Sequence, residues 1–303
     1  MTIPKNWQPY AQLVRLPNVF TALADIGLGA LVVSAAGGAE GLWLRYVWLM
    51  ACSACLYSAG MVWNDFFDIE QDRRERPFRP LPSAKIWRTR AAQIGIGLIA
   101  AGLLFAFLAS GNGTLPLRLA VMLVAAILLY DGWLKRTWAG PIGMGTCRFL
   151  NVLLGLSPPD PTLLPWANRL YLATIVGIYI VGVTWFARTE ARASSRPALT
   201  CAATVMLASL LMGLAVPVLG NAADTSPLFP YLLVGLGFLV GIPVIRAIDR
   251  PIPAQVQPAV KRAIVGLVVL DATLAAGLAG TLGLILLVLL LPTLYLGRWL
   301  YST

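Results

Sequence analysis

Apolar residues occur in ten long stretches along this chain, separated by short polar segments. A membrane-spanning helix needs about 20 mostly apolar residues, because lipid cannot satisfy the hydrogen bonds of an open backbone. Nine stretches are therefore predicted transmembrane helices, and a tenth follows the ninth after almost no loop. The predicted segments are 18–36, 45–63, 92–110, 117–134, 141–157, 170–187, 198–219, 228–248, 263–279 and 282–296.

The last two stretches predict a hairpin. As one helix, residues 264–296 would extend over roughly 50 Å, which is too long for a hydrocarbon core of about 30 Å. A break near Gly280 gives two shorter helices, so we expect a bundle of nine spans, or ten. The first stretch lacks a signal-peptide pattern and is expected to be retained. No linker interrupts the pattern, so residues 1–303 are expected to form a single all-α membrane domain.

Composition supports this reading. The 303 residues are 58% apolar and 12% charged, and the mean hydropathy is +0.77. A soluble domain is about 45–50% apolar and about 25% charged, so an ordinary soluble fold is excluded. The chain contains no histidine. Histidine-based acid–base catalysis and histidine-ligated metal sites are therefore excluded as well.

The basic residues predict the orientation of the bundle. The chain has a net charge of +10, and 18 of its 23 Lys and Arg residues fall in the N-terminal segment and in every second loop. Because cytoplasmic loops carry an excess of Lys and Arg, the N-terminus and the loops after spans two, four, six and eight are expected to be cytoplasmic. We expect a multi-pass protein of the bacterial cytoplasmic membrane. A nucleic-acid-binding function is excluded, because the charges follow membrane sides rather than one groove-sized face.

Acidic residues concentrate where the second span ends. If the helix continues, Asn64, Asp65, Asp68 and Asp72 lie within an arc of about 100°. Three carboxylates on one helix face repel each other unless a cation lies among them. Oxygen-only ligands favour Mg²⁺, which usually keeps coordination positions for waters and substrate phosphates. The segment predicts a Mg²⁺ site, and the alternative is a solvated helix end whose acids pair with neighbouring arginines.

The segment Gly60–Ser83 resembles the first aspartate-rich motif of the UbiA superfamily of intramembrane prenyltransferases. The likeness rests on Asn-Asp-x-x-Asp-x-x-x-Asp followed by Arg-x-x-Arg-Pro-x-Arg-Pro-Leu-Pro-Ser. Arg15 and Asn18 at the start of span one, and residues 130–135 after span four, also fit the family. Residues 145–155 in span five are similar too, and they resemble a divergent branch of the superfamily found in ebo-type gene clusters.

The resemblance implies an enzyme that holds an isoprenyl diphosphate through Mg²⁺, ionises it, and transfers the isoprenyl group to a small-molecule acceptor, often aromatic or lipid-like. The expected metal ligands are Asn64, Asp65, Asp68 and Asp72. The expected catalytic residues are Asp65, Asp68, Asp72 and Lys135. The residues expected to bind substrate are Arg15, Asn18, Asn64, Arg73, Arg74, Tyr130, Asp131, Arg148, Asn151, Arg188 and Arg192.

The chain departs from the family at the second aspartate-rich motif, which should follow span six. When the first motif is aligned with the segment 120 positions later in the chain, Asp68 and Asp72 align with Arg188 and Arg192. Glu190 is the only acidic residue of the motif that this later segment keeps. Guanidinium is not a metal ligand, so a second Mg²⁺ site is not expected. The two arginines either bind the diphosphate directly or follow only the positive-inside distribution.

Charged residues inside spans are rare and are candidates for function. Arg148 and Asn151 share one face of span five, so they are expected either to face the cavity or to bond a neighbouring helix. Asp25 in span one is expected to pair with Arg148 or another basic group, and Asp271 to join helices. Besides a transferase, two functions stay open: a non-catalytic prenyl-lipid binding or export component, and a secondary transporter.

Overall fold

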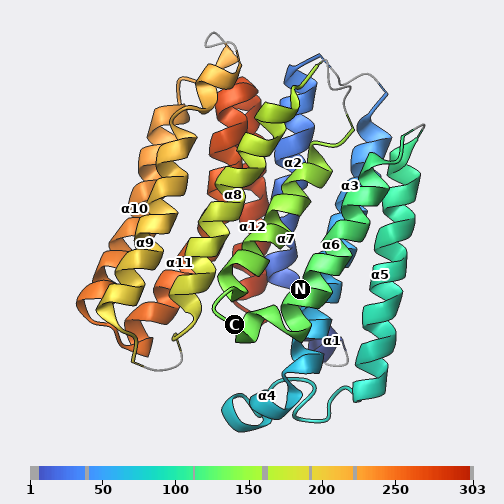
Figure 1. Cartoon of the computed structure of the whole chain (residues 1–303), viewed down its shortest axis with the longest axis vertical. Helices are drawn as coiled ribbons and strands as arrows, with labels where there is room; N and C mark the ends of the chain where they lie inside the picture. The colour runs from blue at the N-terminus through green and yellow to red at the C-terminus, as the bar shows by residue number, and fades with distance from the viewer. Residues whose placement is uncertain are drawn as a thin grey trace.

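The computed structural model is helical, and the residues it describes are 7–37, 41–111, 113–158, 163–190, 193–220 and 224–300. Within them, the helices follow the predicted apolar stretches, and no strand occurs (Figure 1). The predicted all-α bundle is confirmed. The elements are α1 (Gln8–Leu13), α2 (Leu16–Ala35), α3 (Trp43–Phe67), α4 (Ile69–Glu75), α5 (Arg88–Ser110), α6 (Leu115–Gly132), η1 (Leu134–Arg136), α7 (Gly140–Gly155), α8 (Trp166–Ala187), α9 (Arg196–Gly213), η2 (Val216–Leu219), α10 (Phe229–Asp249), α11 (Pro253–Leu278), η4 (Gly280–Leu289) and α12 (Leu290–Gly297).

Eight helical segments in the described residues are long and apolar enough to cross a membrane, with η4 and α12 counted as one. Helix α7 is shorter, at 16 residues, and α11 includes Lys261, Arg262 and Asp271. These two helices still occupy the fifth and ninth predicted stretches. The chain is therefore an integral multi-pass membrane protein.

The predicted hairpin between the last two stretches is confirmed. Helix α11 ends at Leu278, and Gly280 then adopts a φ of +63°. This left-handed conformation favours glycine, because a side chain would collide with the following carbonyl oxygen. The turn sends η4 back along α11 and brings α12 against α2.

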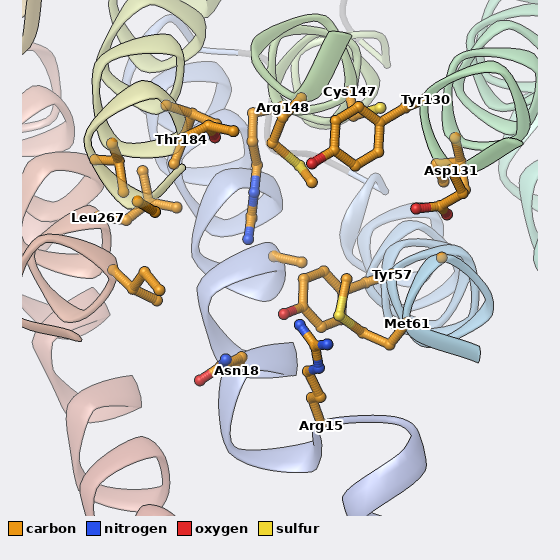
Figure 2. Close-up of a pocket in the computed structure, with 18 of the residues that line it drawn as sticks. Arg15, Asn18, Tyr57, Met61, Tyr130, Asp131, Cys147, Arg148, Thr184 and Leu267 are labelled. Atoms are coloured by element: carbon orange, nitrogen blue, oxygen red, sulfur yellow. The ribbon is translucent and has the colours of Figure 1, made fainter. Parts of the chain in front are cut away.

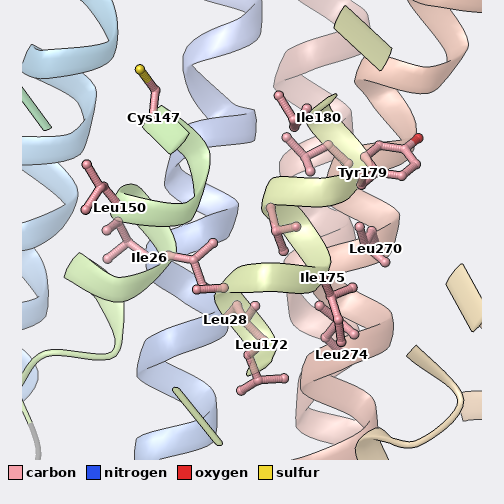
Figure 3. Close-up of a cluster of buried hydrophobic side chains, with 14 of the residues drawn as sticks. Ile26, Leu28, Cys147, Leu150, Leu172, Ile175, Tyr179, Ile180, Leu270 and Leu274 are labelled. Atoms are coloured by element: carbon pink, nitrogen blue, oxygen red, sulfur yellow. The ribbon is translucent and has the colours of Figure 1, made fainter. Parts of the chain in front are cut away.

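The core lies where α2, α7, α8 and α11 meet (Figure 3). Ile26 from α2, Leu150 from α7 and Leu270 from α11 are among its buried side chains. Ile175 of α8 lies with them and is fully buried. These four helices form the centre of the bundle, and α5, α9 and α10 lie in its outer layer.

Close approach of α2 and α7 depends on a pair of glycines. A Cβ atom at position 29 would lie 2.2 Å from the backbone carbonyl carbon of Gly155, a distance that no side-chain movement relieves. We expect Gly29→Val to lower the free energy of unfolding by about 3 kcal/mol, because overpacking must separate the two helices. The melting temperature in detergent measures the effect. Gly97→Val is the matched control, because a Cβ at Gly97 has open space around it; equal melting temperatures for the two variants would contradict the packing argument.

The basic loops gather at one end of the bundle. The connections from α3 to α5, α6 to α7, α8 to α9 and α10 to α11 all lie at the lower end in Figure 1. The sequence assigns these connections to a single side of the membrane, and the structure places them accordingly. The candidate site opens toward this end.

Candidate functional site

A cavity of about 280 Å³ lies between α2, α3, α6, α7, α8 and α11. Much of its wall is aliphatic, as at Leu56, Leu123, Ile127, Ile180 and Leu267. Four guanidinium groups and two carboxyl groups also line it. Such a cavity suits an elongated apolar molecule with an anionic end, because the charged lining is predominantly positive. The charged lining residues are Arg15, Arg76, Arg79, Arg148, Asp131 and Glu190.

The acidic segment does not continue α3 as one helix, so the condition under which the four predicted ligands share one helix face is not met. Helix α3 ends at Phe67, and Asp68 has φ −96° and ψ 7° before α4 begins at Ile69. The break coincides with a strong side-chain contact, in which the Lys135 Nζ atom lies 2.7 Å from the Asp68 carboxylate. Helix α4 ends at Glu75, two residues before Pro77.

Two of the predicted metal ligands converge on a single nitrogen atom. The Arg79 Nη1 atom lies 3.3 Å from Asp65 Oδ1 and 3.0 and 2.8 Å from the two carboxylate oxygens of Asp72. All three residues are buried. Arg15 donates a second hydrogen bond to Asp65 Oδ1 at 3.3 Å. The two carboxylates thus form a small oxygen-lined cradle around one positive group.

The other two predicted ligands turn toward α6 and the loop that follows it. Asp68 pairs with Lys135, and the Arg136 Nη2 atom lies 3.7 Å from its other oxygen. The Asn64 side chain donates to Asp131 Oδ1 at 3.0 Å, and Lys135 donates to the Asn64 carbonyl oxygen at 3.3 Å. The four predicted ligands therefore form two pairs. Within the described residues, no group of three or more acidic or thiol side chains is placed to hold a metal.

The loop after α4 holds Arg79 in position. The backbone N–H and the hydroxyl of Ser83 both donate to the Arg79 carbonyl oxygen, at 3.0 and 2.7 Å. Leu81 and Ile86 of the same loop are buried against Val62 and Leu13 in a small second core. Two hydrophobic anchors and a closed turn thus fix the backbone beneath the site.

Arg15 reaches the site from an unusual backbone conformation. Its φ of 48° and ψ of 52° are left-handed, which is uncommon for a residue with a side chain and often accompanies a functional position. Asn18, one turn later, also lines the cavity. Figure 2 shows the Tyr57 ring between the side chains of Arg15 and Arg148. Tyr57 was not among the predicted site residues, and Tyr130, which was, lines the opposite wall.

A buried polar network lies deeper, within the spans. The Arg148 guanidinium donates to Asp25 Oδ2 at 3.0 Å and to the Thr21 hydroxyl at 2.7 Å. Asn151 donates to the same Asp25 oxygen at 2.7 Å and accepts from Ser53 at 2.8 Å. The predicted pairing of Asp25 with Arg148 is confirmed, and both Arg148 and Asn151 also face the cavity. Each of these groups in the bilayer interior thus has a partner on another helix.

The segment that replaces the second motif lies across the mouth from the first. Glu190 lines the cavity and accepts from Arg76 at 3.5 Å. Burial raises the pKa of the Glu190 carboxyl above its usual value, and the nearby Arg76 charge opposes that shift. The Arg188 side chain is exposed and donates to the carbonyl oxygens of Thr137 and Trp138, away from the cavity lining. Arg192 lies outside the described residues.

The arginines of the first motif divide into two groups. Arg73 and Arg74 are exposed, and Arg73 pairs with Glu70 at 2.7 Å on the surface of α4. Arg76 and Arg79, which were not among the predicted site residues, line the cavity instead. The available signal was their position beside prolines, because Arg76 directly precedes Pro77 and Arg79 lies between Pro77 and Pro80. Prolines restrict the backbone of the loop that follows the helix end.

Comparison with known proteins is consistent with this geometry. The UbiA prenyltransferase family profile matches residues 26–257. The chain belongs to the UbiA prenyltransferase family. It is 32% identical over 148 residues to the digeranylgeranylglyceryl phosphate synthase of Saccharolobus solfataricus, covering 48% of this chain and 50% of that protein. It is 29% identical over 181 residues to the protoheme IX farnesyltransferase of Caulobacter vibrioides, covering 60% and 51%. The matched region thus spans about half the length of these relatives.

Solved UbiA-family structures share the fold. A structure described as digeranylgeranylglyceryl phosphate synthase aligns with a TM-score of 0.63 and 18% identity, covering 91% of this chain and 99% of the other. A UbiA homologue from Archaeoglobus fulgidus, bound to GPP and Mg²⁺, aligns with a TM-score of 0.55 and 13% identity, covering 86% and 99%. At these identities the likeness concerns the fold.

The residues around Arg79 fit the kind of ion that the sequence predicts. Asp65 and Asp72 offer carboxylate oxygens only, which is the donor chemistry that Mg²⁺ prefers. Their oxygens already surround a cationic atom at 2.8–3.3 Å. The cradle is therefore shaped for a positive charge, and in this structure an arginine of the same chain supplies it.

Proposed function

We propose that this UbiA-family protein transfers an isoprenyl group from an isoprenyl diphosphate to a small-molecule acceptor, with Mg²⁺ as cofactor. One observation carries the proposal: an aliphatic cavity in the bilayer-spanning bundle ends beside buried carboxylates and several arginines. The aliphatic wall suits the isoprenyl chain, and the charged end suits a diphosphate with its metal. The active end is proposed to face the cytoplasm of a bacterial cell, following the distribution of basic loops.

The charged end provides the chemistry of diphosphate departure. Arg15, Arg76 and Arg79 surround the mouth, where they can bind the diphosphate and stabilise the negative charge that grows on it as the carbon–oxygen bond breaks. Bound Mg²⁺, held by Asp65 and Asp72, would add charge neutralisation at the same group. Asp68, Lys135 and Asn64 brace the helix end that carries these carboxylates.

When the diphosphate leaves, the isoprenyl group becomes an allylic cation, and the interior of the cavity protects this cation. Aliphatic side chains exclude water, which would otherwise capture it. Tyr57 and Tyr130 present aromatic rings to the cavity, and their π faces can stabilise a passing positive charge. Asp131 also lines it, so it is the carboxyl group best placed to receive a proton from an acceptor. Arg148 and Asn151 offer the polar contacts that would orient the acceptor.

The test is pyrophosphate release by the purified protein with geranyl, farnesyl and geranylgeranyl diphosphates, Mg²⁺ and a panel of aromatic and lipid-like acceptors. Product formation that requires Mg²⁺ supports the transferase. The loss of the second motif favours one other function, a non-catalytic prenyl-lipid binding or export component. Binding of these diphosphates without pyrophosphate release for any acceptor would favour it, and uptake of a small solute into proteoliposomes would favour a transporter.

A further inference from the structure

The Arg79 side chain has two possible sets of partners within reach. Its Nη1 atom bonds Asp65 and Asp72 on one side, at 2.8–3.3 Å, and its side chain lines the cavity on the other. It is buried, with 7% of its surface exposed. A buried guanidinium needs a counter-ion, so Arg79 can leave the carboxylates only for another anion.

We propose that Arg79 is an exchangeable internal cation, which occupies the metal cradle until a divalent metal and a diphosphate arrive together. Asp65 and Asp72 then exchange the guanidinium for the metal, and Arg79 turns to the diphosphate oxygens in the cavity. The inference rests on the proposed function for the identity of the two ligands. No covalent bond changes in this exchange.

The charges explain why the ligands should bind together. At rest, the two carboxylates of Asp65 and Asp72 are balanced by Arg79 and Arg15. A metal bound alone would force Arg79 out of the cradle without a new partner. A diphosphate bound alone would draw Arg79 away and leave Asp72 without a counter-ion. When both bind, every buried charge keeps a partner, so each ligand raises the affinity for the other.

The anchoring of the loop makes the exchange local. Ser83 closes a turn on the Arg79 carbonyl oxygen, and Leu81 and Ile86 hold the loop in the second core. The backbone can therefore stay in place while the guanidinium moves. Arg76 provides a comparison, because it lines the same cavity but pairs with Glu190 rather than with the cradle.

The exchange is tested by binding of Mn²⁺, a spectroscopic substitute for Mg²⁺, to the full chain in lipid nanodiscs without diphosphate. We expect Arg79→Gln to bind Mn²⁺ about tenfold more tightly than the wild type, because the cradle is emptied. Arg76→Gln removes the same charge from the cavity but not from the cradle, and its Mn²⁺ affinity should change by less than about threefold. Equal effects of the two variants, or no gain in Arg79→Gln, would overturn the proposal.

Asp72→Asn provides an independent test if Arg79→Gln does not fold. It releases Arg79 from its closest partner, so binding of inorganic pyrophosphate in metal-free buffer should tighten by about tenfold. Unchanged or weaker pyrophosphate binding would contradict the exchange. Failure of the transferase proposal would be seen separately, as absence of prenyl transfer by the wild type, whereas both binding readouts are independent of turnover.

Discussion

Asp65→Asn is expected to lower the rate of Mg²⁺-dependent pyrophosphate release by about a hundredfold or more, the scale on which loss of one electrostatic contact to a developing charge slows enzymes. The carboxylate is buried and lies between Arg15 and Arg79, so its charge is not screened by water. Asparagine keeps the shape and removes the charge, which isolates the electrostatic contribution. Arg79 retains Asp72 as a partner, so the fold should be preserved. Release is measured with a coupled phosphate assay at saturating isoprenyl diphosphate.

Glu70→Gln is the matched control for this variant. Glu70 belongs to the same acidic segment, but 73% of its side chain is exposed and its partner is the exposed Arg73. Exposed ion pairs contribute little, so we expect its pyrophosphate release to stay within about twofold of the wild type. If Asp65→Asn and Asp72→Asn both release pyrophosphate at the wild-type rate, the metal site proposed at the end of α3 is wrong.

Arg148→Leu is expected to have the largest effect on stability, lowering the free energy of unfolding by about 3–5 kcal/mol. The substitution would leave the fully buried Asp25 carboxylate without its ionic partner, although the hydrogen bond from Asn151 would remain. The bilayer interior provides no water to replace the lost guanidinium. Melting temperature and the yield of monodisperse protein in detergent would both fall.

The double variant Arg148→Leu with Asp25→Asn separates the charge from the packing. It removes both charges, and a buried ion pair can often be replaced by neutral groups with little loss of stability. We therefore expect the double variant to recover most of the melting temperature lost in Arg148→Leu. A double variant as unstable as the single one would show that Asp25 and Arg148 are not energetically coupled.

The residues of the acidic segment show how far sequence reasoning reached at the site. Its composition alone indicated a metal and phosphate site at the end of the second span, since five acids within eleven residues at a membrane boundary need counter-ions. The partners of each acid could not be read from spacing. Asp65 and Asp72 meet Arg79, whereas Asp68 meets Lys135 from another helix, because a slight break at Asp68 rotates the helix end.

The segment after the sixth span shows the same limit. The sequence correctly displays the loss of the second aspartate motif, and it offered Arg188 as a replacement for the missing positive charge of a metal. In the structure Arg188 turns outward to the loop before α7, and the cavity is lined instead by Arg76 with its partner Glu190. A side chain at a helix end can point either way, and only the position of neighbouring loops decides between them.

Hydrophobicity along the chain determined the position and order of the helices, and charge asymmetry determined which loops share an end, because both signals are summed over many residues and tolerate local exceptions. The pairing of Asp25 with Arg148 was also foreseeable, since an isolated charge in lipid must find an opposite one. Tertiary structure alone decided that Arg79 occupies the cradle and that Tyr57 faces the cavity. Those outcomes depend on how one loop folds back over a helix end. The hydrophobic periodicity of the sequence does not indicate which residues such a loop brings into contact.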